Sequence, residues 1–369
     1  MAGNAPGSRI ACIDRLRGLA VLGMFLVHSG PPWLAAEHRG GTYSRALGQI
    51  AGMVAPVFLF LAGVAVAAVA RRAPAEPSPA RRRVIVRGLL IVAAGYGLQV
   101  VFWAARGFTG LDRVLKVDVL HCIGASMALL ALLAWPKGRW NAAAAAGFAI
   151  LLLGAQVTWR LPLAEWLQWP LAAWFTRHAG HSLFPLLPYG AWIALGLFVG
   201  PLWLALREAG RERRFLVGLG IAAAATVGLS FAAGLAERVS GLSALPGPDG
   251  RPVTTTVSFF LLKGAGVMAL LLLARLLDGP LASWRRDPLL LLGRTSLFAY
   301  CVHLVLVYHG LAWTFAGRLT PPQHLAAVVG LAAVMLGLCW VWKRWRRRRQ
   351  DAARTTDSTL RTLSDSQGR

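Results

Sequence analysis

Charged and imidazole side chains stand at opposite ends of one apolar stretch, RIACIDRLRGLAVLGMFLVHS, which runs from Arg9 to Ser29. On an α-helix, the step from Arg17 to His28 advances about 16 Å and turns only about 20°, so both share one stripe, and Asp14 lies roughly 40° round from His28 on the same face. Ionisable groups within a bilayer usually face protein or a wet cavity and mark function. The pattern predicts anion binding by Arg17 and proton transfer by Asp14 and His28. The structural alternative is a rim ion pair between Asp14 and Arg17, with His28 as a helix cap.

Two further histidines have an acidic neighbour in the sequence. His38 follows Glu37 in the next loop and is a candidate general base, because imidazole accepts a proton from an alcohol or amine near neutral pH. Asp118 and His121 are spaced i, i+3 in KVDVLHCIGAS. Asp118 suits a helix N-terminus, where the helix dipole favours an acid. His121 either lines a substrate cavity or forms a hydrogen bond between helices.

A third group of polar residues lies near the C-terminal end of the apolar region. Ser296, Tyr300 and His303 follow i, i+4, i+7 spacing and therefore share one helix face. They are candidates to line a cavity or stabilise oxyanion charge, and polar contacts between helices are the structural alternative. Arg294 and Lys263 are candidate ligands for an anionic cofactor. The chain has no Gly-rich phosphate loop, zinc-ligand spacing or nucleophile elbow, so we expect no metal.

The composition indicates that membrane helices position these residues. Of 369 residues, 56% are hydrophobic and only 15% are charged, and the mean hydropathy is +0.56. A soluble domain would carry about a quarter charged residues. The net charge of +24 would suggest nucleic-acid binding in a soluble chain. Here the basic residues cluster in short loops between apolar stretches, which is typical of membrane orientation, so we expect no nucleic-acid partner.

The fold class predicted is all-α, a polytopic transmembrane helix bundle of about ten spans. The spans expected are 15–30, 47–70, 85–105, 117–135, 141–159, 184–206, 214–236, 256–277, 289–314 and 323–342. Basic loops lie at 71–83, 135–140, 207–214, 275–287 and 343–349. All five fall on one side if the spans alternate, so the positive-inside rule places both termini in the cytoplasm. We expect residues 1–343 to form the membrane domain and 344–369 a basic, then disordered, cytoplasmic tail.

Five of these segments also resemble a known family. They are CIDRLRGLAVLGMFLVHSG, APVFLFLAGVAVA, KVDVLHCIGASMALLALL, LFPLLPYGAWIALGLFVG and LGRTSLFAYCVHLVLVY. In this order they are similar to bacterial proteins related to the catalytic domain of heparan-α-glucosaminide N-acetyltransferase, over about residues 9–310. The ten residues between Arg17 and His28 also match the Arg-to-His motif of the wider acyltransferase type 3 proteins. The resemblance implies a membrane enzyme that takes an acyl group, typically acetyl from acetyl-CoA, on the cytoplasmic side.

The same resemblance implies transfer to a hydroxyl or amine of a sugar or other glycan acceptor at the outer face. In the lysosomal enzyme the essential histidine lies in the loop after the first helix, which His38 approximately matches, whereas in the type 3 proteins it ends that helix, as His28 does. The expected setting is the bilayer of the bacterial inner (plasma) membrane, with a homo-oligomer as an option. A transporter of an anionic or sugar-linked metabolite, with the same buried ions as a proton relay, is the alternative from another class.

Overall fold

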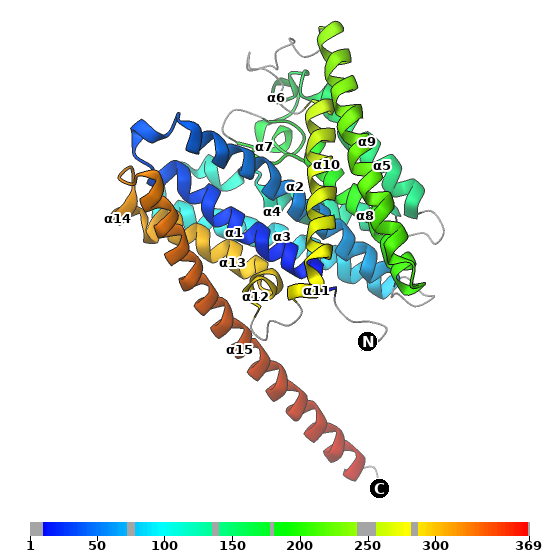
Figure 1. Cartoon of the computed structure of the whole chain (residues 1–369). Helices are drawn as coiled ribbons and strands as arrows, with labels where there is room; N and C mark the ends of the chain where they lie inside the picture. The colour runs from blue at the N-terminus through cyan, green and yellow to red at the C-terminus, as the bar shows by residue number, and fades with distance from the viewer. Residues whose placement is uncertain are drawn as a thin grey trace. The chain divides into compact units, whose positions relative to one another are not determined.

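The computed structural model describes residues 10–71, 78–134, 140–177, 181–241, 256–281 and 287–367. The long helices there are α1 (Ala11–Trp33), α2 (Thr42–Arg71), α3 (Ser78–Ala105), α4 (Val119–Ala134), α5 (Trp140–Thr158), α8 (Leu186–Glu208), α9 (Glu212–Val239), α10 (Val257–Leu276), α13 (Ser296–Val305) and α15 (Pro321–Gln367). The shorter ones are η1 (Ala36–His38), η2 (Leu111–Leu115), α6 (Leu163–Trp166), α7 (Trp169–Ala172), α11 (Asp278–Leu281), α12 (Pro288–Arg294), η4 (Leu306–Gly310) and α14 (Ala312–Phe315). The regular elements of the described residues are all helical, so the all-α prediction is confirmed for them (Figure 1).

Several helices can cross a bilayer. Six are long and apolar enough: α2, α3, α8, α9, α10 and α15. A seventh would join α12 to α13 and η4, with a bend of 87° at the break between them. The helices α4 and α5 are apolar but shorter. Nine of the ten predicted segments each lie on one helix, whereas the segment predicted at 289–314 is divided among α12, α13, η4 and α14. The chain is a multi-pass membrane protein. Parts of the predicted basic loops, at 72–77, 135–139 and 282–286, lie outside the described residues.

The chain divides into two compact units. One unit combines the residues up to Gly48 with those from Pro280 onward, and the other runs from Gln49 to Gly279. The first unit therefore joins the two ends of the chain, and it contains α1, α12, α13 and α15.

In the first unit, α1 packs against α12, α13 and α15 (Figure 1). Its contact with α12 depends on two glycines. A methyl group on Gly18 would overlap the backbone carbonyl of Leu289, and one on Gly293 would overlap that of Asp14. Small residues of this kind let membrane helices approach backbone to backbone. The side chains that flank these glycines on α1 and α12 are consequently brought within reach of one another.

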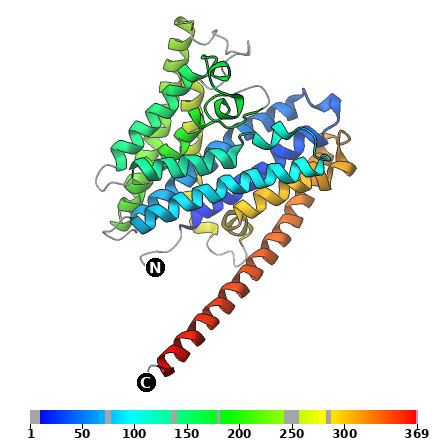
Figure 2. The ribbon, with the colours of Figure 1, turned by 180° about the vertical axis from the view of Figure 1, so that it is seen from behind.

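In the second unit, glycines also let two other pairs of helices approach backbone to backbone. Gly63 of α2 lies against the backbone of Ile193 in α8, and Gly88 of α3 lies against that of Gly124 in α4. The pair α3 and α4 runs side by side when seen from behind (Figure 2), and α9 packs along α10. Exposed residues make up most of α3 and α9, whose apolar windows are only 17% buried.

The last helix is longer than the predicted span. α15 continues from its apolar part through the basic residues 343–349 to Gln367. Trp342 stacks on Phe298 of α13, with ring centroids 4.8 Å apart, and on Trp345, at 4.9 Å. Residues 350–367, which the composition predicts to be disordered, are helical here. This agrees with the absence of glycine and proline between Leu338 and Gln367, because these are the residues that break helices most strongly.

Candidate active site

The charged end of α1 forms an ion-pair cluster with α12. One oxygen of the Asp14 carboxylate lies 3.5 Å from Arg17 Nη1, and the other lies 3.1 Å from Arg294 Nε. The side chain of Asp14 is 9% exposed, whereas those of Arg17 and Arg294 are 20% and 34% exposed. One carboxylate thus faces two guanidinium groups, so the cluster keeps a net positive charge on its accessible side. Such a cluster suits a phosphate, which guanidinium groups bind with paired hydrogen bonds.

A second ion pair next to it was not foreseen from the sequence. Arg15 Nε lies 2.6 Å from Asp287 Oδ2, and both side chains are almost fully buried. Arg15 also donates to the Leu281 carbonyl at 3.0 Å. Asp287 caps α12 by accepting from the Leu290 amide at 3.0 Å, directly before Pro288. The pair therefore fixes the start of α12 against α1, and its burial indicates a structural role.

The other end of the stripe carries a pair of histidines. His28 Nδ1 lies 2.9 Å from His303 Nε2, and the two rings stack with centroids 5.2 Å apart at 12°. His303 is fully buried and His28 half-buried. The Tyr300 ring makes T-shaped contacts with both, with centroids 6.3 Å from that of His28 and 5.6 Å from that of His303. Of the predicted stripe on α13, Tyr300 and His303 reach His28, and Ser296 begins that helix one turn earlier.

Hydrogen bonding fixes which nitrogen of each ring carries a proton. His303 Nδ1 lies 2.8 Å from the Ala299 carbonyl, which can only accept, so Nδ1 is the donor. Neutral His303 then has a lone pair on Nε2, and His28 Nδ1 donates to it. In neutral His28 this leaves the lone pair on Nε2, for which no hydrogen-bond partner is found among the described residues. The arrangement holds the His28 ring in place and, in its neutral form, leaves Nε2 as the basic nitrogen.

A π-helical turn follows these residues. η4 closes with a bond of 2.7 Å from the Leu311 amide to the Leu306 carbonyl, five residues back. Trp33, the last residue of α1, donates from its indole to the Val307 carbonyl at 3.1 Å. Single π turns are rare and often occur at functional sites. This turn and the indole contact anchor α13 beside the end of α1.

A third buried histidine, His324 at the start of α15, is absent from the sequence-based set. Its Nε2 lies 2.8 Å from Ser29 Oγ, and its Nδ1 lies 2.6 Å from the Tyr43 hydroxyl. Ser29 Oγ donates to the Phe25 carbonyl at 2.6 Å, so it accepts from His324 Nε2, and Tyr43 donates to Nδ1. Both ring nitrogens therefore have partners. The only sequence signal for this network is a polar residue at the start of an apolar span.

His38 lies apart from the histidine pair. It ends η1, and its Nε2 faces Glu37 Oε1 at 3.6 Å. The Glu37 side chain is 77% exposed and that of His38 is 31% exposed. No contact between His38 and the His28 ring is found in the described part of the chain.

The other predicted residues belong to the second unit. Asp118 Oδ1 accepts from the Val119 amide at 2.7 Å, and His121 Nδ1 accepts from the Asp118 amide at 3.1 Å. This reciprocal pattern caps the start of α4 in the manner of a capping box. The ring of fully buried His121 lies edge-on to Tyr96, at 4.2 Å, and near Trp174, at 6.0 Å.

Lys263 is buried in α10 of the same unit. Its ammonium group lies 3.5 Å from Gln49 Oε1 and 5.3 Å from the centre of the Phe259 ring. A methyl group on Gly52 would approach the ammonium nitrogen to 3.0 Å, so this glycine makes room for the lysine head. No carboxylate pairs with Lys263 among the described residues.

Comparison with known proteins gives one match and one negative result. A family model described as heparan-alpha-glucosaminide N-acetyltransferase, catalytic, matches residues 9–227. A comparison with curated proteins found no match. The family match covers more than half of the chain, including α1 with Arg17 and His28, and ends before Lys263, Arg294 and His303. The chain therefore belongs to the heparan-alpha-glucosaminide N-acetyltransferase catalytic-domain family, whose members are acetyl-CoA-dependent N-acetyltransferases.

Proposed function

We propose that the protein transfers an acetyl group from cytoplasmic acetyl-CoA to a hydroxyl or amine of a sugar or glycoconjugate at the outer face, with His28 as general base. The observation that carries this assignment is the bond from His28 Nδ1 to His303 Nε2, which in the neutral ring leaves the lone pair on His28 Nε2. A base must have its lone pair free and its ring held in place. His38 has no comparable orienting partner in the described residues, and this supports His28 over His38.

Arg17 and Arg294 bind the phosphates of CoA in this proposal. Their fit rests on the excess positive charge around Asp14 and on the partial exposure of both guanidinium groups. Asp14 holds the two arginines in position rather than moving a proton, because its two carboxylate oxygens face them. Bound acetyl-CoA supplies the acetyl group as a thioester, a good acyl donor.

His28 Nε2 takes the proton of the attacking hydroxyl or amine as that oxygen or nitrogen bonds to the acetyl carbon. The carbon–sulfur bond breaks, and the proton passes from His28 to the CoA sulfur. Tyr300, against the edges of both imidazole rings, is placed to donate to the oxyanion of this step. Ser296, one turn away on the same helix, lines the approach. Lys263, Asp118 and His121 support the fold of the second unit.

The membrane arrangement follows from the distribution of basic residues. We propose ten crossings, with α1, α4 and α5 added to the seven long or bent spans, both termini in the cytoplasm, and residence in the plasma membrane. Arg17 then lies at the cytoplasmic end of α1 and His28 toward the outer end.

Sealed vesicles of one orientation test this function directly. With labelled acetyl-CoA and a glycan acceptor on opposite sides, we expect label on the acceptor only when acetyl-CoA is on the face that carries the α15 tail. Transfer only with both on one side contradicts transfer across the membrane. An acceptor that crosses without being acetylated indicates the transporter alternative.

A further inference from the structure

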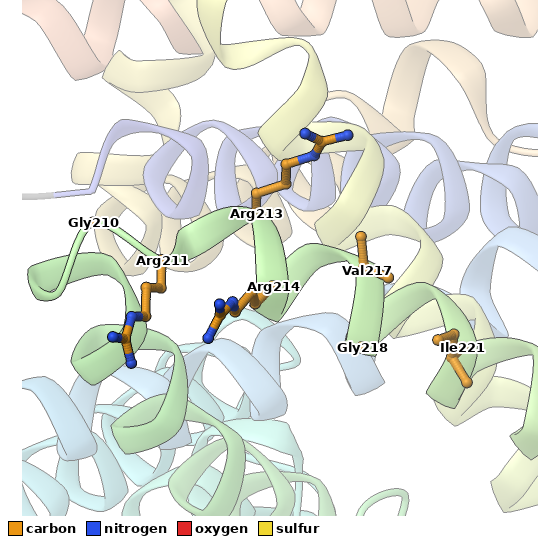
Figure 3. Close-up of a pocket in the computed structure, with 7 residues that line it drawn as sticks. All are labelled: Gly210, Arg211, Arg213, Arg214, Val217, Gly218 and Ile221. Atoms are coloured by element: carbon orange, nitrogen blue, oxygen red, sulfur yellow. The ribbon is translucent and has the colours of Figure 1, made fainter.

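A surface hollow lies at the start of α9, within the second unit (Figure 3). Its volume is about 710 Å³. One end is lined by an arginine cluster, defined as Arg211, Arg213 and Arg214, and the rest by Val217, Gly218 and Ile221. Since α9 is one of the helices able to cross a bilayer, its first residues lie at a membrane interface, where lipid phosphates are.

The positive charge of the arginine cluster is not neutralised by ion pairs, because the two neighbouring carboxylates bind other residues. Glu208 pairs with Arg71 at 2.5 Å. Glu212 lies inside the cluster in sequence, but it accepts from Arg275 at 2.8 and 3.0 Å and from the Trp203 indole at 3.1 Å. No ion pair of the three arginines is found in the described ranges. The hollow therefore presents uncompensated positive charge.

The remainder of the hollow is apolar and open. Arg214, Val217, Gly218 and Ile221 follow i, i+3, i+4, i+7 spacing and lie on one face of α9. Val217 is 56% exposed and Ile221 is 66% exposed. Nothing lies within 4 Å of a methyl group built on Gly218, so this glycine leaves a gap between the two apolar side chains. Figure 3 shows Arg211 and Arg214 pointing to the same side of α9, with Arg213 pointing away.

We propose that this hollow binds an anionic phospholipid. The phosphate lies between Arg211 and Arg214, and one acyl chain follows the gap at Gly218 between Val217 and Ile221. Positive charge above an apolar groove matches both parts of such a lipid, as in other basic clusters beside membrane spans. This site is independent of the acetyl-transfer chemistry at α1.

Native mass spectrometry of the full-length protein, delipidated in neutral detergent and titrated with phosphatidylglycerol or phosphatidylcholine, tests the proposal. We expect preferential binding of phosphatidylglycerol. The double variant Arg211→Gln/Arg214→Gln should weaken it about 30-fold, from about fivefold for each arginine near an anionic membrane. Arg83→Gln, an exposed arginine at the start of α3, is the matched control and should leave it unchanged.

The variant Gly218→Leu distinguishes binding of a lipid from binding of a free phosphate compound. It should weaken phosphatidylglycerol binding about tenfold, equivalent to the burial of roughly two methylene groups, because it fills the acyl groove. It should leave binding of CoA unchanged. Equal affinity of all variants for phosphatidylglycerol overturns the proposal. So does displacement of the lipid by CoA in both the wild type and Gly218→Leu, which would make the cluster a nucleotide site.

Discussion

Two histidines meet neighbouring residues of α1 in contrasting ways. His303 bonds to His28 and leaves one nitrogen of that ring without a partner. His324 bonds to Ser29 and Tyr43, and every polar atom of this second network has a partner. Both histidines are fully buried. The contrast teaches that burial alone does not distinguish the two networks, whereas the unpartnered ring nitrogen of His28 does, and on this difference we base the proposal that His28 is the general base.

The largest effect on kcat should follow removal of the His28 side chain, whose Nε2 has no hydrogen-bond partner among the described residues. His28→Ala should lower kcat by about 10²- to 10⁴-fold, the usual contribution of a positioned general base. The KM for acetyl-CoA should stay near the wild-type value, because the charged end of α1 is untouched. Steady-state kinetics of acetyl transfer measure both. A comparable loss in His38→Ala, with His28→Ala active, would move the base to the loop.

Replacement of His303, which orients the His28 ring, should have the next largest effect on kcat. In His303→Leu, His28 Nδ1 has no acceptor and its ring can turn, which should lower kcat about 10²-fold, as expected for a misplaced group. His303→Gln offers a carbonyl oxygen in place of Nε2 and should recover part of the rate. The KM for acetyl-CoA should not change in either. If both variants are equally slow and both melt early, His303 has only a structural role.

The two arginines beside Asp14 should control the affinity for acetyl-CoA rather than the rate of acetyl transfer. Arg17→Gln or Arg294→Gln should raise the KM for acetyl-CoA about tenfold or more, since a hydrogen bond to a charged group contributes about 1.5–3 kcal/mol. kcat should be nearly unchanged. Arg318→Gln removes the same charge from an exposed site of the same unit and should have no effect. An unchanged KM in both test variants would place the CoA phosphates elsewhere.

A substitution in the network of His324, Ser29 and Tyr43, where every polar atom has a partner, should have the smallest effect on activity. Tyr43→Phe leaves His324 Nδ1 buried without a donor, which should lower the free energy of unfolding by about 1–3 kcal/mol. kcat per folded molecule should match the wild type. Thermal unfolding followed with activity measurements tests this. Loss of kcat at unchanged stability would bring His324 into the reaction and remove the contrast.

Helix periodicity accounts for the parts of the site that the sequence predicted. The eleven-residue spacing fixes Arg17 and His28 on one stripe of α1, and i, i+3 spacing puts Tyr300 and His303 on one face of α13. Periodicity within a helix says nothing about which helix lies beside it. The bond between His28 and His303 joins residues 275 positions apart, so it required the structure.

The break between α12 and α13 also escaped prediction. Its central residue, Thr295, is neither glycine nor proline, and Gly293, two residues earlier, lies within the last turn of α12. The packing of α12 depends on Gly18 and Gly293, each of which contacts the backbone of the other helix. The sequence does not show which helices are in contact. His324 was missed for a similar reason, because its partners Ser29 and Tyr43 come from the other end of the chain.

The regular course of α1 between its charged end and His28 sets a fixed distance between these two groups. The two prolines of this helix, Pro31 and Pro32, come after His28, so the eleven-residue segment before it keeps a fixed length of about 16 Å. In the proposed function, a donor anchored by its phosphates at Arg17 carries its reactive carbon that far along the helix. We therefore expect donors with a truncated linker to be held firmly and yet remain unreactive, so that one rigid helix acts as a molecular ruler for the donor.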